Sequence, residues 1–162
     1  MTGRVVDEQL AAIEVGWRRL RQAVESLGPE GMDRRTSSGW TVKELVAHLA
    51  FWEETTDPVI NGMLRGDDVP LERWYGGAEL GVTDGQPWPD SSVHNAREAA
   101  WARDRPAQEV MARWDRSHSR LLAVVATITE EEAAGTDYLG RVGIFSSEHY
   151  AEHLSEVEAL LA

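Results

Sequence analysis

Cysteine is absent from this chain of 162 residues. Its absence excludes disulfides, thiolate metal sites and a cysteine nucleophile, and it is typical of proteins of the reducing cytoplasm. We therefore expect a cytoplasmic location. Any thiol chemistry that the protein performs must use a thiol from another molecule.

Long apolar runs and a surplus of positive charge are also absent. No apolar run approaches the roughly 20 residues of a membrane-spanning helix, and the N-terminal sequence MTGRVVDEQL lacks the apolar segment of a secretion signal. The 16 basic and 28 acidic residues leave a net charge of −12. Nucleic acids and anionic membranes attract clustered lysine and arginine, so we expect neither a nucleic acid nor a membrane as a partner.

Apolar residues recur at spacings of three and four, which is the period of an amphipathic helix. In the first predicted helix they form one seam, made of Leu10, Ile13, Trp17, Leu20, Val24 and Leu27. Asp7 is the expected N-cap of this helix and Gly28 its expected stop. No two segments carry a hairpin signal. The sequence therefore predicts an all-α fold, with residues 1–162 forming a single domain.

The second predicted helix has a well-defined start. Thr41 and Glu44 have the S/T-x-x-E spacing of a capping box. His48 and Trp52 follow on one face of this helix, together with two leucines. Pro58 must kink the helix or open a new turn, because proline cannot continue the backbone hydrogen bonding.

Residues 66–91 show no helical period and contain Trp74 and two further aromatic residues among glycines and prolines. The third helix is expected from Ser92, with a bend or restart at Pro106, and the last helix from Ser146 or its neighbour. Antiparallel neighbours need only about 2–8 connecting residues, so this longer stretch allows helices two and three to run parallel. The prediction is a four-helix bundle with a long crossover between helices two and three.

Histidines are the candidates for chemistry. His149 and His153 are four residues apart, which places both imidazoles on one helical face within reach of one metal ion. His48 lies on the apolar face of the second helix, and three imidazoles can converge inside a bundle. Three histidines with an open fourth position are typical of a catalytic metal site, and nitrogen ligands suit zinc, nickel or iron.

The same residues have plainer interpretations. His149 and His153 can be a solvated pair on an acidic helix, and His48 can be a core histidine with a satisfied hydrogen bond. His118 also lies on an apolar stripe, so it can replace one member of this set or simply donate to a backbone carbonyl. His94 is expected to be exposed at a helix start. Three glutamates on the last helix are candidate acceptors for imidazole N–H groups, with a solvated acidic face as the alternative: Glu148, Glu152 and Glu156.

Two histidine-bearing motifs carry a family resemblance. GWTVKELVAHLAFW (Gly39–Trp52) and HYAEHL (His149–Leu154) resemble motifs of the DinB-like superfamily, and Arg105–Leu122 resembles its third helix. The superfamily includes the metal-binding N-terminal domain of mycothiol-dependent maleylpyruvate isomerase. The resemblance implies an up-down-down-up bundle that holds a divalent metal through His48, His149 and His153.

The resemblance also implies an activity. Characterised members are often S-transferases or isomerases that use mycothiol, bacillithiol or glutathione, so we expect a thiol-dependent enzyme acting on a small electrophile, with zinc or nickel and a low-molecular-weight thiol. Trp52 and Trp74 are the expected walls of the substrate pocket, and no catalytic residue is identified. The superfamily also has metal-free members, including the colibactin self-resistance protein, so a binding protein that sequesters or hydrolyses a reactive natural product is the alternative. A bundle that serves mainly as a homodimer is a third hypothesis.

Overall fold

The computed structural model describes residues 4–65, 91–135, 142–144 and 146–162. The regular secondary structure of these residues is helical, and they contain no strand beyond one isolated bridge between Arg35 and Thr41. Four rods form the bundle: α1 (Val5–Ser26), α3 (Val42–Glu54) with its continuation α4 (Thr56–Arg65), α6 (Ala107–Val125) and α9 (Ser147–Leu161). Three shorter helices are α2 (Gly28–Gly31), α5 (Ser91–Arg103) and α7 (Glu130–Gly135).

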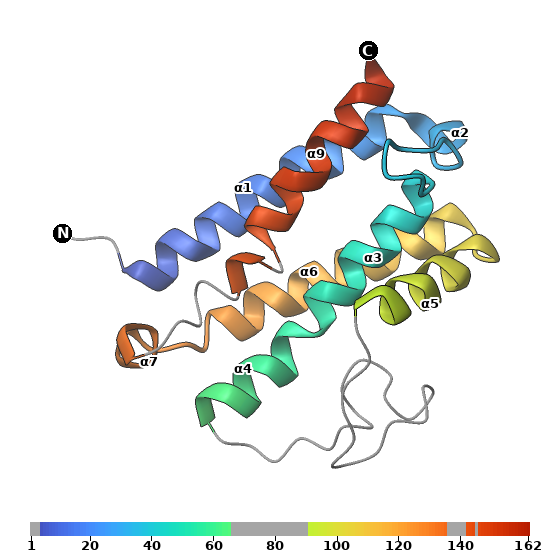
Figure 1. Ribbon diagram of the computed structural model, residues 1–162. Helices are drawn as coiled ribbons and strands as arrows, with labels where there is room; N and C mark the ends of the chain where they lie inside the picture. Colours follow the sequence, from blue (N-terminus) through green and yellow to red (C-terminus); the bar gives the residue numbers. More distant parts are fainter. Residues whose placement is uncertain (1–3, 66–90, 136–141, 145) are drawn as a thin grey trace.

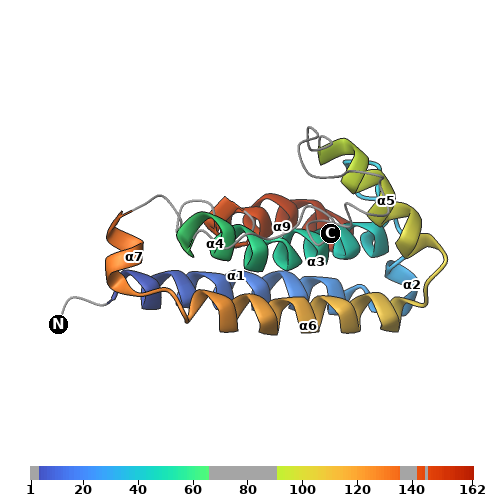
Figure 2. The ribbon, with the colours of Figure 1, turned by 90° about the horizontal axis from the view of Figure 1, so that it is seen from below.

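The rods follow the up-down-down-up order. α1 and α9 run in one direction, and α3 and α6 run in the other (Figure 1). α1 packs against α9 and α6, and α3 packs against α6 and α9 (Figure 2). The predicted all-α four-helix bundle is therefore confirmed. No helix in the described part of the chain is both long and apolar enough to cross a membrane.

Local signals explain most helix ends. The capping box at the start of α3 is present, since the Glu44 amide donates to Thr41 Oγ1 at 3.1 Å and the Thr41 amide donates to the Glu44 carboxylate at 2.9 Å. Gly28 follows α1 with a φ of 69°, a left-handed value that favours glycine. Asp7 is not the N-cap of α1: the helix starts two residues earlier behind Arg4, and Asp7 lies in its first turn.

The third helix differs from the prediction. The chain does restart after Pro106, but α5 and α6 run in opposite directions (Figure 1). α5 returns along α3 and leans out of the bundle (Figure 2) before α6 begins. Pro106 shows in the sequence that a new helix begins there. The angle between α5 and α6 depends instead on what α5 packs against.

The core lies between the four rods. Its fully buried members include Ile13, Leu20, Leu45, Trp114 and Leu121. Burying one large aliphatic or aromatic side chain contributes about 1.5–3 kcal/mol. The seam predicted for the first helix thus faces the core, although Leu10, Trp17 and Leu27 are only partly buried.

A buried carboxyl group crosses this core. Glu53 of α3 is 1% exposed and accepts a hydrogen bond from Trp114 Nε1 of α6 at 3.0 Å. Ser117 of α6 and Tyr150 of α9 also hydrogen-bond to it. Burial raises the pKa of Glu53 to about 8, against the lowering effect of these hydrogen bonds. Glu53 thereby connects α3, α6 and α9 beside the histidine-bearing face of α9.

Candidate metal centre

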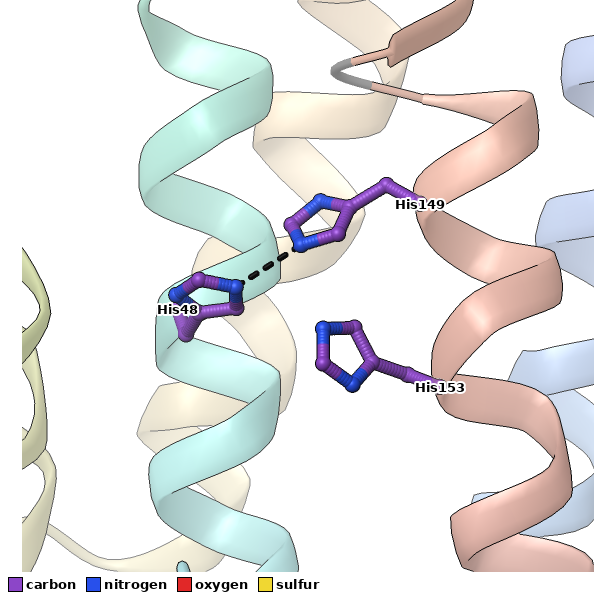
Figure 3. Close-up of side chains that lie close together, drawn as sticks. All are labelled: His48, His149 and His153. Atoms are coloured by element: carbon purple, nitrogen blue, oxygen red, sulfur yellow. Dashed lines mark hydrogen bonds between the residues drawn. The ribbon is translucent and has the colours of Figure 1, made fainter. Parts of the chain in front are cut away.

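Three imidazoles meet between two rods of the bundle. His48 projects from α3, and His149 and His153 project from α9 toward it (Figure 3). Nε2 of His48 lies 2.7 Å from Nε2 of His149, and one nitrogen from each of the three rings lies within 4.8 Å of the others. This is the only group of three or more histidines and carboxylates with such spacing in the part of the chain that the structure describes.

Helix geometry and packing bring the rings together. The four-residue spacing of His149 and His153 places them on one face of α9, and the ring centroids lie 4.8 Å apart. His48 faces them from the buried side of α3, and its side chain is 7% exposed. Tyr150, the residue after His149, donates a hydrogen bond to Glu53 and so joins α9 to α3 next to the cluster.

The outer nitrogens of two rings have acceptors. Nδ1 of His48 lies 2.9 Å from Oδ1 of Asn95, and Nδ1 of His153 lies 3.0 Å from a carboxylate oxygen of Glu156. Both oxygens accept, so each Nδ1 carries a proton, and in the neutral ring of His48 Nε2 keeps its lone pair. Hydrogen bonds of this kind hold metal-binding imidazoles in one tautomer and orientation.

Burial and neighbouring charges keep the rings of His48 and His149 neutral near pH 7. Burial lowers the pKa of His48 to about 4, with a further contribution from His153. Burial and the two neighbouring imidazoles lower the pKa of His149 to about 2. Glu156 stays ionised beside them: burial alone would raise its pKa, but hydrogen bonds from Ser38, His153 and Thr36 lower it.

The donor set fits a divalent metal. Since His48 donates through Nδ1 to Asn95, its Nε2 can only accept, and His149 must supply the proton between the two facing nitrogens. For a cation to bind here, this proton must move to Nδ1 of His149, which has no hydrogen-bond partner among the described residues. His149 then offers Nε2 as the lone pair of a neutral imidazole, the form of histidine that binds metals. Three nitrogen ligands suit zinc or nickel and leave a position for another ligand.

A cavity of about 460 Å³ opens beside the three histidines. Trp40 and Trp52 form part of its wall, and the Trp40 ring lies 4.7 Å from the ring of His48. Trp52 also donates through Nε1 to Oδ1 of Asn95 at 3.1 Å, so one amide oxygen holds a wall residue and a histidine. Trp74, the other expected wall residue, lies outside the described residues.

The remaining histidines lie elsewhere. His118 stacks on Trp17 at 4.1 Å and pairs with Glu14 at 2.9 Å, so it does not join the cluster. His94 was expected to be exposed, and that prediction is wrong: it is 1% exposed and stacks on Phe51. The rotation of α5 about its own axis places His94 on the buried side. The short segment before Pro106 does not specify this rotation in the sequence.

The three glutamates on α9 differ in their surroundings. Glu156 accepts from an imidazole, whereas Glu148 and Glu152 are exposed. Asn95 escaped the sequence analysis because its contact with His48 spans 47 residues. Its only signal is its place directly after His94 in α5.

Comparison with known proteins decides the family. A family model described as the DinB superfamily matches residues 12–157. The chain belongs to the DinB superfamily. No curated protein sequence matches it.

Several solved structures are similar to this chain in fold, at low sequence identity. The colibactin self-resistance protein ClbS, in complex with a dsDNA, has a TM-score of 0.75 and 15% identity over 99% of this chain and 98% of its own. An uncharacterised protein from Escherichia coli UTI89 has a TM-score of 0.73 and 14% identity, covering 96% and 92%. A protein from Streptococcus pneumoniae has a TM-score of 0.73 and 13% identity, covering 99% and 92%.

One prediction needs correction. The exclusion of nucleic acid partners from net charge is wrong, because a protein of this fold forms a complex with a dsDNA. Net charge sums over the whole surface, whereas contacts to phosphates depend on where a few basic side chains lie. A net charge of −12 therefore does not decide the question.

Proposed function

We propose that this DinB superfamily protein is a divalent-metal-dependent enzyme, a thiol-dependent S-transferase or isomerase that acts on a small electrophile. The observation that supports the proposal best is the convergence of three imidazoles beside a cavity of about 460 Å³. An open cavity at a three-histidine centre gives a small molecule access to the remaining ligand position.

Each residue of the site has a part in this function. His48, His149 and His153 hold the metal, with zinc or nickel as the candidates, and Asn95 and Glu156 orient two of these rings. A bound divalent metal lowers the pKa of a thiol that it coordinates. The chain has no cysteine, so the thiol is a cosubstrate such as mycothiol, bacillithiol or glutathione. Trp52, with Trp74 as a further candidate, forms the wall against which the electrophile binds.

Elemental analysis tests the metal centre. Purified protein reconstituted with zinc or nickel and then desalted should retain one metal per chain. The double variant His149→Ala/His153→Ala should retain almost none, because a single histidine is left. His118→Ala is the control, since His118 lies outside the cluster, and it should retain the metal. Stoichiometric metal in the double variant would contradict the assignment.

The reaction needs a separate assay. Metal-loaded protein is incubated with monochlorobimane and each of the three thiols in turn, and the fluorescent conjugate is followed. Acceleration that disappears in the double variant supports transfer at this centre. Acceleration that persists in the double variant would show that the metal site is not the reactive one.

A metal-free self-resistance protein is the second candidate. Two observations favour it: the fold likeness to the colibactin self-resistance protein and the tryptophans beside the cavity. Such a protein would sequester or hydrolyse a reactive natural product without a metal. Failure to retain any metal after reconstitution would favour this candidate over the first.

A further inference from the structure

The charge of the cavity wall restricts the ligands that can enter. The described residues that line the cavity include two carboxylates, Glu152 and Glu156, and neither lysine nor arginine. We infer that the cavity selects a thiol that is uncharged or cationic over one that carries a carboxylate. This inference rests on the proposed function, because it names the class of thiol that the same site takes.

The two carboxylates play different parts. Glu156 is half-buried and accepts the Nδ1 proton of His153, so it belongs to the framework of the histidine cluster. Glu152 is exposed, and its carboxylate has neither a hydrogen bond nor an ion pair among the described residues. It lies directly before His153 on α9 and lines the cavity. Its charge can therefore interact with a ligand in the cavity.

Other acidic groups near α3 are treated differently by the fold. Glu44 pairs with Arg103 at 2.6 Å, and Glu54 and Glu98 share Arg113 at 2.8 and 2.6 Å. Arginines thus compensate these carboxylates of α3 and α5, and none of the described arginines lines the cavity. Among the described residues, the wall keeps the charge of Glu152 without a basic partner. This charge opposes the attraction that a bound divalent metal exerts on a ligand carboxylate.

The aromatic wall favours the same class of ligand. The faces of Trp40 and Trp52 carry partial negative charge, so a cationic group next to them is attracted. An ammonium group near Glu152 and a tryptophan gains from both. A carboxylate at the same place meets repulsion from Glu152 and loses part of its hydration without a cationic side chain to replace it.

Thiols of similar size and different charge test this inference on protein loaded with Co²⁺. Cysteamine is cationic, 2-mercaptoethanol is uncharged and 3-mercaptopropionate is anionic. Coordination of a thiol changes the visible absorption of Co²⁺, which gives an affinity without an activity assay. Titrations are run at low and at high salt, since salt screens an exposed charge.

The variant Glu152→Gln removes the charge and keeps the shape. It should weaken binding of cysteamine by about two- to fivefold, strengthen binding of 3-mercaptopropionate by about the same factor and leave 2-mercaptoethanol unchanged. Each thiol is compared with itself in the two proteins, so differences in thiol acidity cancel. The effect should shrink at high salt.

Glu148→Gln is the matched control. Glu148 lies one helical turn before Glu152 on α9, is exposed and does not line the cavity. Glu148→Gln removes the same charge from the protein and should leave its affinity for each of the three thiols unchanged. Equal effects of the two variants, or no change in either, would overturn the inference. A cobalt spectrum that no thiol alters would instead contradict the proposed function, so the two failures are distinguishable.

Discussion

At the scale of single residues, Asn95 has the most specific position in the site. Its side-chain oxygen accepts from His48 and from Trp52, at 2.9 and 3.1 Å, and so holds a histidine of the cluster and a wall residue of the cavity together. His48 is the one histidine of the cluster on α3, so its tautomer decides whether a lone pair faces the two histidines of α9. In the proposed metal centre, Asn95 acts through His48 and is a positioning residue.

Asn95→Ala should therefore weaken zinc binding by roughly 10- to 100-fold, the usual effect of removing a partner behind a ligating imidazole. Competition with a chromophoric chelator measures the affinity. Asn95→Asp keeps the acceptor oxygen and should bind zinc at least as tightly as the unchanged protein. Equal zinc affinities for the alanine variant and the unchanged protein would show that α3 packing alone orients His48.

Glu53 gives a prediction about pH. Its pKa of about 8 in the folded protein exceeds the ordinary value of 4.5, so the folded state holds this proton more tightly than the unfolded state. Stability from this group is complete below about pH 4.5 and is lost as pH rises toward 8. The contribution is on the order of a few kcal/mol.

Glu53→Gln should flatten this part of the pH dependence. The amide oxygen can accept from Trp114 and Tyr150, and the amide nitrogen can donate to Ser117, so the network survives without a titratable group. Urea unfolding at pH 5 and pH 8 compares the two proteins. The unchanged protein should lose clearly more stability between these pH values than the variant. A parallel loss in both would place the titrating group elsewhere.

At the scale of elements, α3 matters most, because it supplies His48 and packs against α5, α6 and α9. Its start depends on the capping box, in which Thr41 and Glu44 each satisfy an amide of the other. Glu44 is 2% exposed and is also paired with Arg103, so the first turn of α3 is held on two sides.

Removing the cap should weaken the whole bundle moderately. Thr41→Ala should lower the free energy of unfolding by about 1 kcal/mol, because the Glu44 amide loses its acceptor. Chemical denaturation monitored by circular dichroism measures the change. Ser119→Ala on the exposed face of α6 is the control and should stay within about 0.5 kcal/mol. Equal values for the two variants would mean that the Glu44–Arg103 pair alone secures this turn.

At the scale of the whole molecule, the site joins rods from the two halves of the chain. His48 and His149 are 101 residues apart in sequence and 2.7 Å apart at their Nε2 atoms. A ligand held by both binds only the folded bundle, so its binding free energy adds to the free energy of unfolding.

Zinc at about 100 times its dissociation constant should stabilise the protein by about 2.7 kcal/mol. For a chain of this size that corresponds to a rise in Tm of roughly 5–10 °C, measured by differential scanning fluorimetry. The double variant His149→Ala/His153→Ala should show no rise. A rise of similar size in that variant would place the bound zinc elsewhere on the chain.

Local chemistry in the sequence determined the helices and the histidine spacing. The capping box at Thr41, the glycine stop at Gly28 and the four-residue separation of His149 and His153 depend on neighbours in the chain, so they can be seen before folding. The resemblance of two motifs to the DinB-like superfamily then pointed to the bundle order and to the three histidines together, and the family match confirms the membership.

Only the tertiary structure decided the contacts that cross the bundle. The role of Asn95, the inward turn of His94, the reversal of α5 and the three-helix network around Glu53 each depend on the rotation of one helix against another. That rotation is set by packing between segments many residues apart, and a helical period specifies it only where the apolar face is wide and regular. Apolar residues are spread almost evenly around the α5 helix. The sequence therefore does not specify which side of α5 is buried, and tertiary packing decides it.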